Sequence, residues 1–221
     1  WIWKGKIKRK VYKVAQIHDN INEEKYKDKI KTEKCFLYQF LKIIYSTLLK
    51  ILFRPQIIGK ENIPQKGALI FAGNHRHAID PTVVMMSTDR IVHYMAKEEL
   101  FKGLHGKIFN KIGLIKVYRG KPNYKAIEEA EKILNNGGTI GIFPEGTRNK
   151  TQNNLLEFRK GAVRIAKSTN IPILPFAIKG EYKLFRKSIT LEFGNPIDVS
   201  KMEIEEGNEY LRNEVLKLYR K

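Results

Sequence analysis

The stretch Ala-Leu-Ile-Phe-Ala-Gly-Asn-His-Arg-His-Ala-Ile-Asp, residues 68–80, decides the fold of this 221-residue chain. It begins with a short apolar run that is typical of a buried strand and ends in a polar loop. A second stretch of the same kind follows about seventy residues later, where an apolar run at residues 139–143 leads into Phe-Pro-Glu-Gly-Thr-Arg, residues 143–148. Because open α/β sheets bind ligands at the carboxyl ends of parallel strands, we expect both loops to open into one crevice.

Apolar runs and helical patterns alternate through the rest of the chain. The runs that predict strands are residues 68–72, 91–96, 113–118, 139–143, 173–178 and 189–193. The helical patterns between them are residues 81–89, 98–110, 123–136 and 159–169. A last amphipathic helix is expected near the C-terminus, where Leu211, Val215 and Leu218 share one stripe. This alternation predicts an α/β fold with a mainly parallel or mixed sheet flanked by helices.

The chain is strongly basic, with an unevenly distributed net charge of +19. Residues 1–60 carry 15 Lys and Arg against 5 Asp and Glu, which is just over half of the excess. Such a bias indicates an anionic partner, either a nucleic acid or an anionic membrane surface. A single cysteine, Cys35, excludes an internal disulfide and fits a reducing compartment. The first residue is Trp1 and the first methionine is Met85, so we expect the natural N-terminus to lie upstream.

The segment FLYQFLKIIYSTLLKILF, residues 36–53, is long and apolar enough to raise the question of a membrane helix. Its polar residues Gln39, Lys42, Ser46 and Lys50 are spaced so that they share one helical face. A spanning helix would place Lys42 near the bilayer centre at a cost of about 3 kcal/mol. We favour a helix that lies in the interface, with both lysines among the lipid headgroups. The alternative is a helix at the edge of the domain whose apolar face packs on the core.

His75 stands where a strand-like run ends, and Asp80 follows five residues later. If Asp80 accepts a hydrogen bond from one ring nitrogen of His75, the other nitrogen can take a proton from a substrate hydroxyl. None of the serines lies in a Gly-x-Ser-x-Gly turn, so we expect His75 to activate the substrate's own hydroxyl. Two structural interpretations stay open: His75 as a satisfied buried histidine, and Asp80 as an N-cap before Pro81.

Two functions from other classes also stay open. His75, His77 and Asp80 resemble the ligand spacing of metal-dependent hydrolases. The chain offers no second His/Asp cluster to complete such a site, so we expect no metal. A basic nucleic-acid-binding protein is the other alternative. We expect no nucleic-acid partner, because the chain lacks an RNP-type aromatic motif and zinc-finger spacing.

The loop at residues 143–148 has the composition of an anion site. Pro144 and Gly146 favour a tight turn, and the planar guanidinium of Arg148 suits a phosphate group. Glu145 is placed to orient a hydroxyl or the arginine.

Two further cations follow other strand-like runs. Arg119 ends the segment Gly-Leu-Ile-Lys-Val-Tyr-Arg, residues 113–119, and Lys97 follows the run at residues 91–96. Each alone is typical of a solvated surface charge. Together with Arg148 they place three cations at three strand ends, which predicts a pocket for a phosphorylated substrate.

With these residues in view, the chain resembles a known family, the 1-acylglycerol-3-phosphate acyltransferases of phospholipid synthesis. The resemblance extends from about residue 36 to residue 199 and does not include the basic segment before it. Four blocks carry it in the family's order: NHRHAID at 74–80, GLIKVYR at 113–119, FPEGTR at 143–148 and IPILPFA at 171–177. Many members carry serine two residues after the catalytic histidine, where this chain has His77.

The resemblance implies transfer of a fatty acyl group from acyl-CoA or acyl carrier protein to the free hydroxyl of 1-acylglycerol 3-phosphate, with no cofactor. It implies His75 as the general base and Asp80 as its partner. The block at 171–177 is implied to line the acyl pocket or to support the sheet. The residues we predict to bind substrate are Arg119, Glu145, Gly146, Thr147, Arg148 and Lys97. Another acceptor, glycerol 3-phosphate or a different lysolipid, stays open.

We expect three regions along the chain. They are a basic extension at residues 1–35, a membrane-interface helix at 36–54 and an acyltransferase catalytic domain at 55–221. A protein built in this way is expected to be monotopic on the cytoplasmic face of a membrane, with an anionic lipid surface as a partner.

Overall fold

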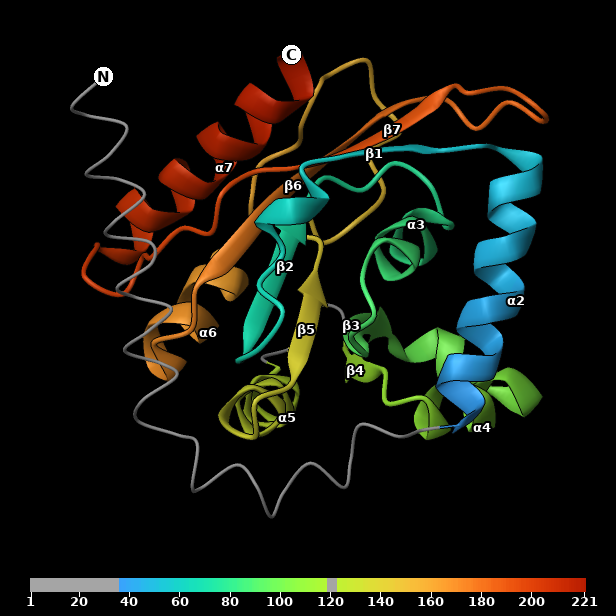
Figure 1. Ribbon diagram of the computed structural model, residues 1–221. Helices are drawn as coiled ribbons and strands as arrows, with labels where there is room; N and C mark the ends of the chain where they lie inside the picture. Colours follow the sequence, from blue (N-terminus) through green and yellow to red (C-terminus); the bar gives the residue numbers. More distant parts are fainter. Residues whose placement is uncertain (1–35, 119–122) are drawn as a thin grey trace.

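The computed structural model describes residues 36–118 and 123–221 and shows helices on both faces of a central sheet (Figure 1). The strands are β1 Gln56–Ile58, β2 Leu69–Gly73, β3 Val92–Lys97, β4 Ile115–Val117, β5 Thr139–Ile142, β6 Ile173–Gly180 and β7 Ile189–Phe193. The helices are α2 Phe36–Leu52, α3 Asp80–Ser87, α4 Gly103–Lys111, α5 Tyr124–Asn135, α6 Gly161–Thr169 and α7 Ile204–Arg220. Two short 3-10 helices are η2 Lys60–Asn62 and η3 Glu98–Phe101. The expected basic extension at residues 1–35 lies outside the described residues.

The strand order is β1-β7-β6-β2-β5-β3-β4. Neighbours from β6 through β2, β5 and β3 to β4 are parallel, whereas β7 is antiparallel to β6 and β1 is parallel to β7. This mixed sheet confirms the predicted fold class. The sequence patterns missed β1, and the helix expected at residues 98–110 is divided into η3 and α4, because the backbone of Lys102 between them is extended.

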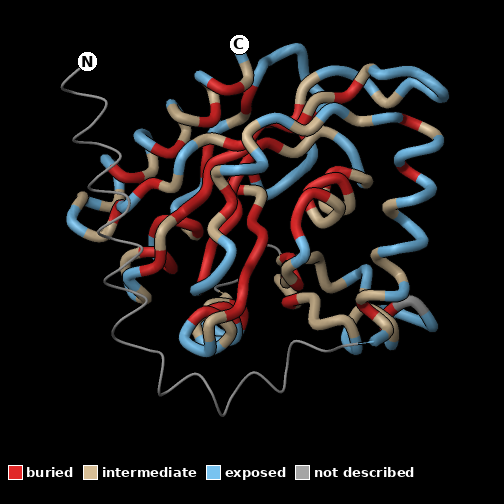
Figure 2. The backbone as a smooth tube through the Cα atoms, in the orientation of Figure 1, coloured by how far each residue is buried: buried red, intermediate tan, exposed pale blue. Residues whose placement is uncertain are grey.

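The core is divided between the two faces of the sheet, as expected for strands that are covered on both sides. All five residues of β2 are buried (Figure 2). The side chains of residues 69–72 alternate between two apolar clusters. Ile70 and Ala72 pack with residues of α5, α6 and α7. Leu69 and Phe71 pack with residues of α2 and α3. The strand is therefore held from both faces, which gives the loop after it a rigid base.

Helix α2 packs on the domain through a narrow face. Tyr38 and Leu49 are buried, and the Tyr38 oxygen accepts the Val92 N–H at 2.9 Å. The Lys42 ammonium donates to the Thr88 carbonyl oxygen, and burial lowers the pKa of Lys42. The expectation that both lysines reach lipid headgroups is therefore wrong for Lys42. The chemical reason is that the long lysine stem lets its ammonium satisfy a carbonyl at the end of α3.

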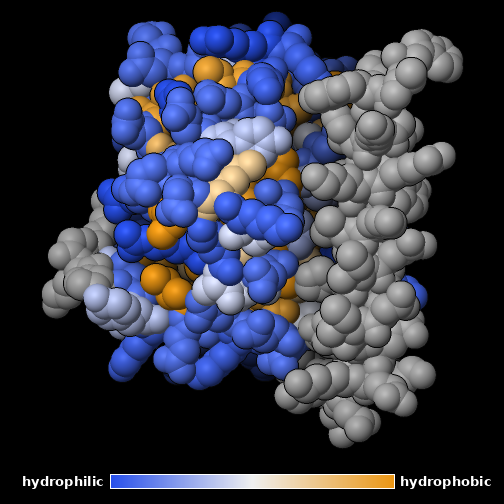
Figure 3. Space-filling view, turned by 90° about the vertical axis from the view of Figure 1, so that its left-hand side faces the viewer, coloured by the Kyte–Doolittle hydropathy of each residue, from blue (hydrophilic) through white to orange (hydrophobic). Residues whose placement is uncertain are grey.

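The wide apolar face of α2 points away from the domain. Its large exposed side chains are Phe36, Phe40, Ile43, Ile44, Tyr45, Leu48 and Ile51. This corrects the alternative in which that face packs on the core. The face of the molecule drawn in Figure 3 differs, because hydrophilic residues predominate among its described residues. Within residues 36–118 and 123–221, no helix has the length and hydropathy needed to cross a bilayer.

Candidate active site

The carboxyl ends of β2, β5 and β3 lie side by side, because the three strands are parallel neighbours in the sheet. The loop with His75 follows β2, the loop at residues 143–148 follows β5, and Lys97 is the last residue of β3. The predicted convergence of these segments at one sheet edge is therefore observed. Arg119, which was expected to join them after β4, lies outside the described residues.

His75 and Asp80 form the predicted pair. The Nδ1 atom of His75 lies 2.9 Å from Oδ2 of Asp80. The Asp80 side chain is fully buried, while that of His75 is 18% exposed. The imidazole stacks on the Phe143 ring, with centroids 4.1 Å apart and planes 21° from parallel. A neutral histidine in this position donates from Nδ1–H to the carboxylate, which leaves the Nε2 lone pair to accept a proton.

The Asp80 carboxylate is surrounded by hydrogen-bond donors. Its Oδ2 atom accepts the backbone N–H groups of Arg76 at 2.7 Å and His77 at 2.8 Å, in addition to the His75 ring. Its Oδ1 atom accepts the Tyr182 hydroxyl at 2.7 Å. The interpretation of Asp80 as an N-cap is wrong, because the cap residue of α3 is Ile79 and no side chain caps the helix. The carboxylate faces back into the loop, and its donors offset the cost of burying a charge.

Tyr182 is a site residue that the sequence analysis missed. It follows β6, and its ring contacts that of Phe53 edge-on at 5.3 Å and that of His77 at 4.7 Å. Burial raises the pKa of Tyr182, and the charge of Asp80 and the hydrogen bond to it raise this pKa further. The phenol therefore remains a donor at neutral pH. The only sequence cue was its position after a strand-like run.

The loop at residues 143–148 is attached to the backbone of His75 on both sides. Glu145 Oε1 accepts the His75 N–H at 3.0 Å, and the Asn149 N–H donates to the His75 carbonyl oxygen at 2.6 Å. Glu145 Oε2 accepts the Leu156 N–H at 3.2 Å. Burial raises the pKa of Glu145, against the opposing effects of these N–H donors and of the charges on His75 and Arg76. Glu145 thus holds the histidine in place, and its contact with an acceptor stays a prediction.

Between these two anchors, the loop presents three exposed residues, Gly146, Thr147 and Arg148. The Gly146 N–H donates to the Phe143 carbonyl oxygen at 2.9 Å, which is the predicted tight turn. Gly146 has φ +65°, and a Cβ atom there would lie 2.6 Å from Nε of Arg159. Only glycine fits this turn without displacing that side chain. Arg148 is exposed and directly precedes Asn149, whose N–H contacts the His75 backbone.

The block at residues 171–177 forms much of β6, which pairs with β2. The side-chain amide of Asn74 is completely buried and exchanges hydrogen bonds with both backbone groups of Ile178, at 2.9 and 2.7 Å. This contact ties the residue before His75 to β6. The block therefore supports the sheet beneath the site, which is one of its two expected roles. Asn74 was missed because its amide reads as an ordinary loop residue in the sequence.

The residues of the metal-site interpretation, His75, His77 and Asp80, make other contacts in the structure. His75 and Asp80 engage each other, and His77 Nδ1 accepts the Ile79 N–H at 3.3 Å. In the described part of the chain, no group of three or more His, Cys, Asp or Glu side chains is arranged to hold a metal ion.

A histidine paired with a buried carboxylate lies beside an exposed loop that contains an arginine, an arrangement that suits base chemistry next to an anion site. The family model "Acyltransferase" matches residues 54–179, which is more than half of the chain. The chain belongs to this acyltransferase family.

Relatives of this family agree in name. The 1-acyl-sn-glycerol-3-phosphate acyltransferase of Bacillus subtilis is 30% identical over 169 residues, which cover 73% of this chain and 82% of the relative. The protein of the same name from Borreliella burgdorferi is 33% identical over 141 residues, 62% of this chain and 56% of its own length. The crystal structure of the 1-acyl-sn-glycerophosphate (LPA) acyltransferase PlsC from Thermotoga maritima has a TM-score of 0.65 and covers 98% of this chain and 87% of its own. At 24% identity, that likeness supports the fold.

Proposed function

We propose that the protein transfers a fatty acyl group from a thioester to the free hydroxyl of 1-acylglycerol 3-phosphate, forming phosphatidic acid and a free thiol. The observation that carries this proposal is the His75–Asp80 pair at the sheet edge, with Nδ1 engaged and Nε2 on the other side of the ring. We assign 1-acylglycerol 3-phosphate as the acceptor because the names of the relatives state this compound.

The reaction follows from this pair. His75 Nε2 removes the proton from the acceptor hydroxyl as its oxygen attacks the thioester carbonyl carbon. A tetrahedral intermediate forms and collapses, the carbon–sulfur bond breaks, and the departing thiolate takes the proton back from His75. Asp80 keeps Nδ1 protonated and stabilises the imidazolium that exists between the two proton transfers. Phe143, stacked on the ring, and Glu145, bonded to the His75 N–H, hold the imidazole in position.

The phosphate of the acceptor is assigned to the loop beside His75. Arg148 supplies the planar donors that suit a phosphate, and Gly146 and Thr147 bring the loop backbone close to it. Lys97 lies at the end of β3 on the same edge and adds positive charge. Arg119 is assigned to the same group by its sequence block. This division gives base chemistry to the loop after β2 and anion binding to the loops after β5, β3 and β4.

Helix α2 is assigned to the membrane, where both the lipid acceptor and the product reside. Its exposed apolar face would enter the interface, and Lys50, which is exposed at its C-terminal end, would lie among anionic headgroups. This gives a monotopic protein on the cytoplasmic face, with residues 55–221 as the catalytic domain. Acyl-CoA and acyl carrier protein are both suitable donors, because the chemistry requires only a thioester.

A direct assay tests the proposal. Purified protein is incubated with 1-acylglycerol 3-phosphate and a panel of acyl-CoA and acyl carrier protein thioesters, and phosphatidic acid and released thiol are measured. We expect both products in equal amounts, with no loss of rate when EDTA is added. Glycerol 3-phosphate and other lysolipids serve as matched acceptors. Faster transfer to one of these would replace the assigned acceptor, and thiol release without an acylated product would indicate a hydrolase.

A further inference from the structure

The loop between β6 and β7, residues 181–188, presents two large apolar side chains to solvent. Leu184 is 59% exposed and Phe185 is 61% exposed. They occupy the middle of a turn in which the Arg186 N–H donates to the Lys183 carbonyl oxygen at 3.3 Å. Phe185 has φ +59°, a conformation that glycine or asparagine adopts at much lower cost in a turn. A phenylalanine held there and exposed gains nothing from the fold itself.

This turn is joined to the outward face of α2. The Phe185 N–H donates to the carbonyl oxygen of Leu52, the last residue of α2. Ile51, whose side chain is exposed, directly precedes Leu52 and therefore lies beside that contact. The base of the loop is closed by hydrogen bonds between Glu181 and Ser188, so the turn is a defined projection from the sheet. The apolar tip thus continues the apolar surface of the helix.

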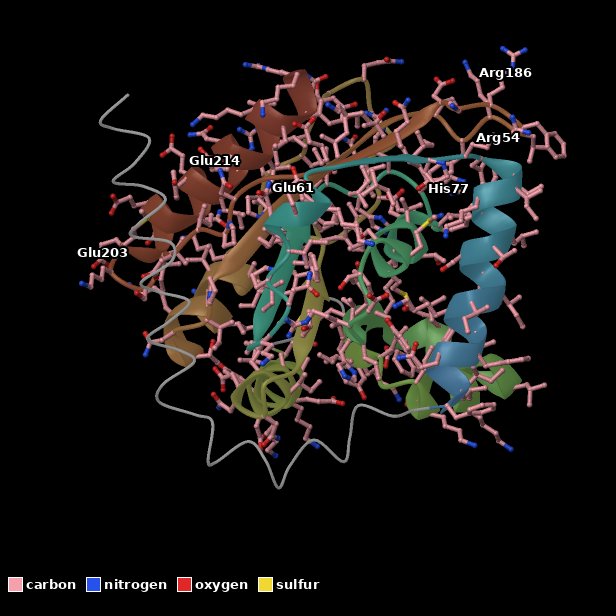
Figure 4. The ribbon with its side chains drawn as sticks, viewed as in Figure 1. Arg54, Glu61, His77, Arg186, Glu203 and Glu214 are labelled. Atoms are coloured by element: carbon pink, nitrogen blue, oxygen red, sulfur yellow. The ribbon has the colours of Figure 1, made fainter. Side chains whose placement is uncertain are left out.

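Basic residues flank the apolar tip in the sequence. Lys183, Arg186 and Lys187 are exposed in the loop, and Arg54 is exposed just after α2. Figure 4 shows Arg54 and Arg186 at the same corner of the molecule, although they come from distant parts of the sequence. The loop contains one acidic residue, Glu181, which pairs with Lys183 at 3.1 Å. An apolar tip flanked by cations complements a bilayer with anionic headgroups.

We propose that residues 181–188, together with Arg54, form a second membrane contact, with Leu184 and Phe185 inserted below anionic lipid headgroups. The axis of α2 and the loop tip beside its C-terminal end would together restrict the tilt of the domain on the bilayer. The loop also contains Tyr182, whose hydroxyl reaches Asp80, so the contact lies next to the catalytic pair. The proposal builds on the membrane contact assigned to α2 and adds an element that the apolar helix does not predict.

Tryptophan fluorescence tests the insertion. The only tryptophans are Trp1 and Trp3, so both are replaced by phenylalanine in the full chain and one new tryptophan is added at a time. With vesicles that contain anionic lipid and brominated acyl chains, we expect strong quenching and a blue shift for Phe185→Trp. Ile43→Trp on α2 is the positive control. Tyr124→Trp on α5, where the native side chain is 76% exposed, is the negative control.

Charge reversal tests the headgroup contact. Arg186→Glu with Lys187→Glu should weaken binding to anionic vesicles by about tenfold or more. Lys125→Glu with Lys201→Glu, which changes the net charge equally at exposed positions elsewhere, should have a smaller effect. Phe185→Ser should weaken binding to neutral vesicles as well, since it removes apolar insertion.

The outcomes separate this proposal from the proposed function, because quenching requires no turnover. Quenching in the Ile43→Trp variant without quenching in the Phe185→Trp variant would overturn the loop contact and leave α2 in place. Unchanged vesicle binding of the Arg186 and Lys187 variant, with a raised KM for acyl carrier protein, would assign these cations to an acidic protein donor instead. Quenching in the Phe185→Trp variant of a chain inactive toward every lysolipid would refute the proposed reaction alone.

Discussion

The sheet edge at His75 and the outer face of α2 are organised in opposite ways. At the sheet edge, Asp80 is fully buried and has four donors, and Glu145 is buried with two. On α2, seven large apolar side chains remain exposed on a helix anchored by a few residues such as Tyr38 and Lys42. The chain itself completes the first region. In the second region, the described residues leave these side chains exposed, and we propose that a membrane covers them.

The contrast indicates where each kind of mutation should act. Buried polar groups with satisfied partners fix geometry, so their loss should change rates or the free energy of unfolding. Exposed apolar groups contribute little to the folded state, so their loss should change only the partition between water and membrane. Variants that violated this division would refute the assignment of one region or the other.

The largest expected effect is on the base. His75→Ala should lower the rate of acyl transfer by about 100-fold to 10,000-fold, because positioned base catalysis supplies an acceleration of this size. Steady-state kinetics on vesicle-bound acceptor measures it, with circular dichroism to show that the fold is kept. His77→Ala is the matched control, since its backbone N–H to Asp80 survives the substitution. Equal losses in both variants, with activity restored by added zinc, would favour the metal-dependent hydrolase.

The second prediction tests the apolar face. Replacing Ile43, Leu48 and Ile51 with serine should weaken vesicle binding by about 100-fold, at about 1 kcal/mol of lost insertion for each residue. Because these side chains are exposed, the free energy of unfolding should hardly change. Sedimentation with vesicles and urea unfolding measure the two quantities. A large loss of stability would mean that the face packs on protein. Release by Lys50→Glu alone, with the triple variant still bound, would make the attachment purely electrostatic.

The sequence predicted the parts of this structure that depend on local pattern. Apolar runs located six of the strands, and the strand-end position of His75 and Arg148 implied that their loops share one edge. The pattern did not show that β7 reverses direction, although the connection after Gly180 has only eight residues. A parallel crossover requires about a dozen or more residues, so the loop length held the information. Strand β1 is too short for its alternation to stand out.

The residues that were missed depend on contacts between distant segments. A helical pattern shows that Lys42 shares a face with Ser46, but not that this face turns toward Thr88. Glu145 as a substrate ligand stays a prediction, and its hydrogen bond to the His75 N–H could not be predicted because the two residues lie about seventy positions apart. Tyr182 reaches Asp80 only because β6 lies beside β2. In each case the partner is fixed by the tertiary arrangement of distant segments, which no local pattern encodes.

The third prediction separates anion binding from base chemistry at the sheet edge. Arg148→Ala should lower kcat/KM for the phosphorylated acceptor by about tenfold to 100-fold, because it removes a charge-assisted contact worth about 1.5 to 3 kcal/mol. The KM for the thioester should stay unchanged. Lys150→Ala, an exposed basic residue just outside the loop, is the control. Arg119→Ala is expected to act as Arg148→Ala does. Equal losses for donor and acceptor would assign these arginines to the donor's phosphates.

The smallest effect is expected at Glu145, whose carboxylate links the loop after β5 to the His75 backbone. Glu145→Gln keeps one acceptor oxygen but turns an amide donor toward a backbone N–H, so it should lower the free energy of unfolding by about 1 to 2 kcal/mol. Urea unfolding measures the loss, with the exposed Glu157→Gln as the control. The loosened His75 backbone should also lower kcat more than it changes the KM for the acceptor.

The pH dependence of that loss in unfolding free energy gives a sharper test of the role of Glu145. Because burial raises the pKa of Glu145 above its ordinary value of 4.5, the folded chain binds more protons than the unfolded chain between the two pKa values. The wild type therefore loses stability as the pH rises through that window, and Glu145→Gln lacks this contribution. The deficit of the variant should thus be larger at about pH 4 than at about pH 7. A stability deficit that grows toward neutral pH would mean that the N–H donors of His75 and Leu156 outweigh the cost of burying the Glu145 charge. The ionised carboxylate of Glu145 would then stabilise the site.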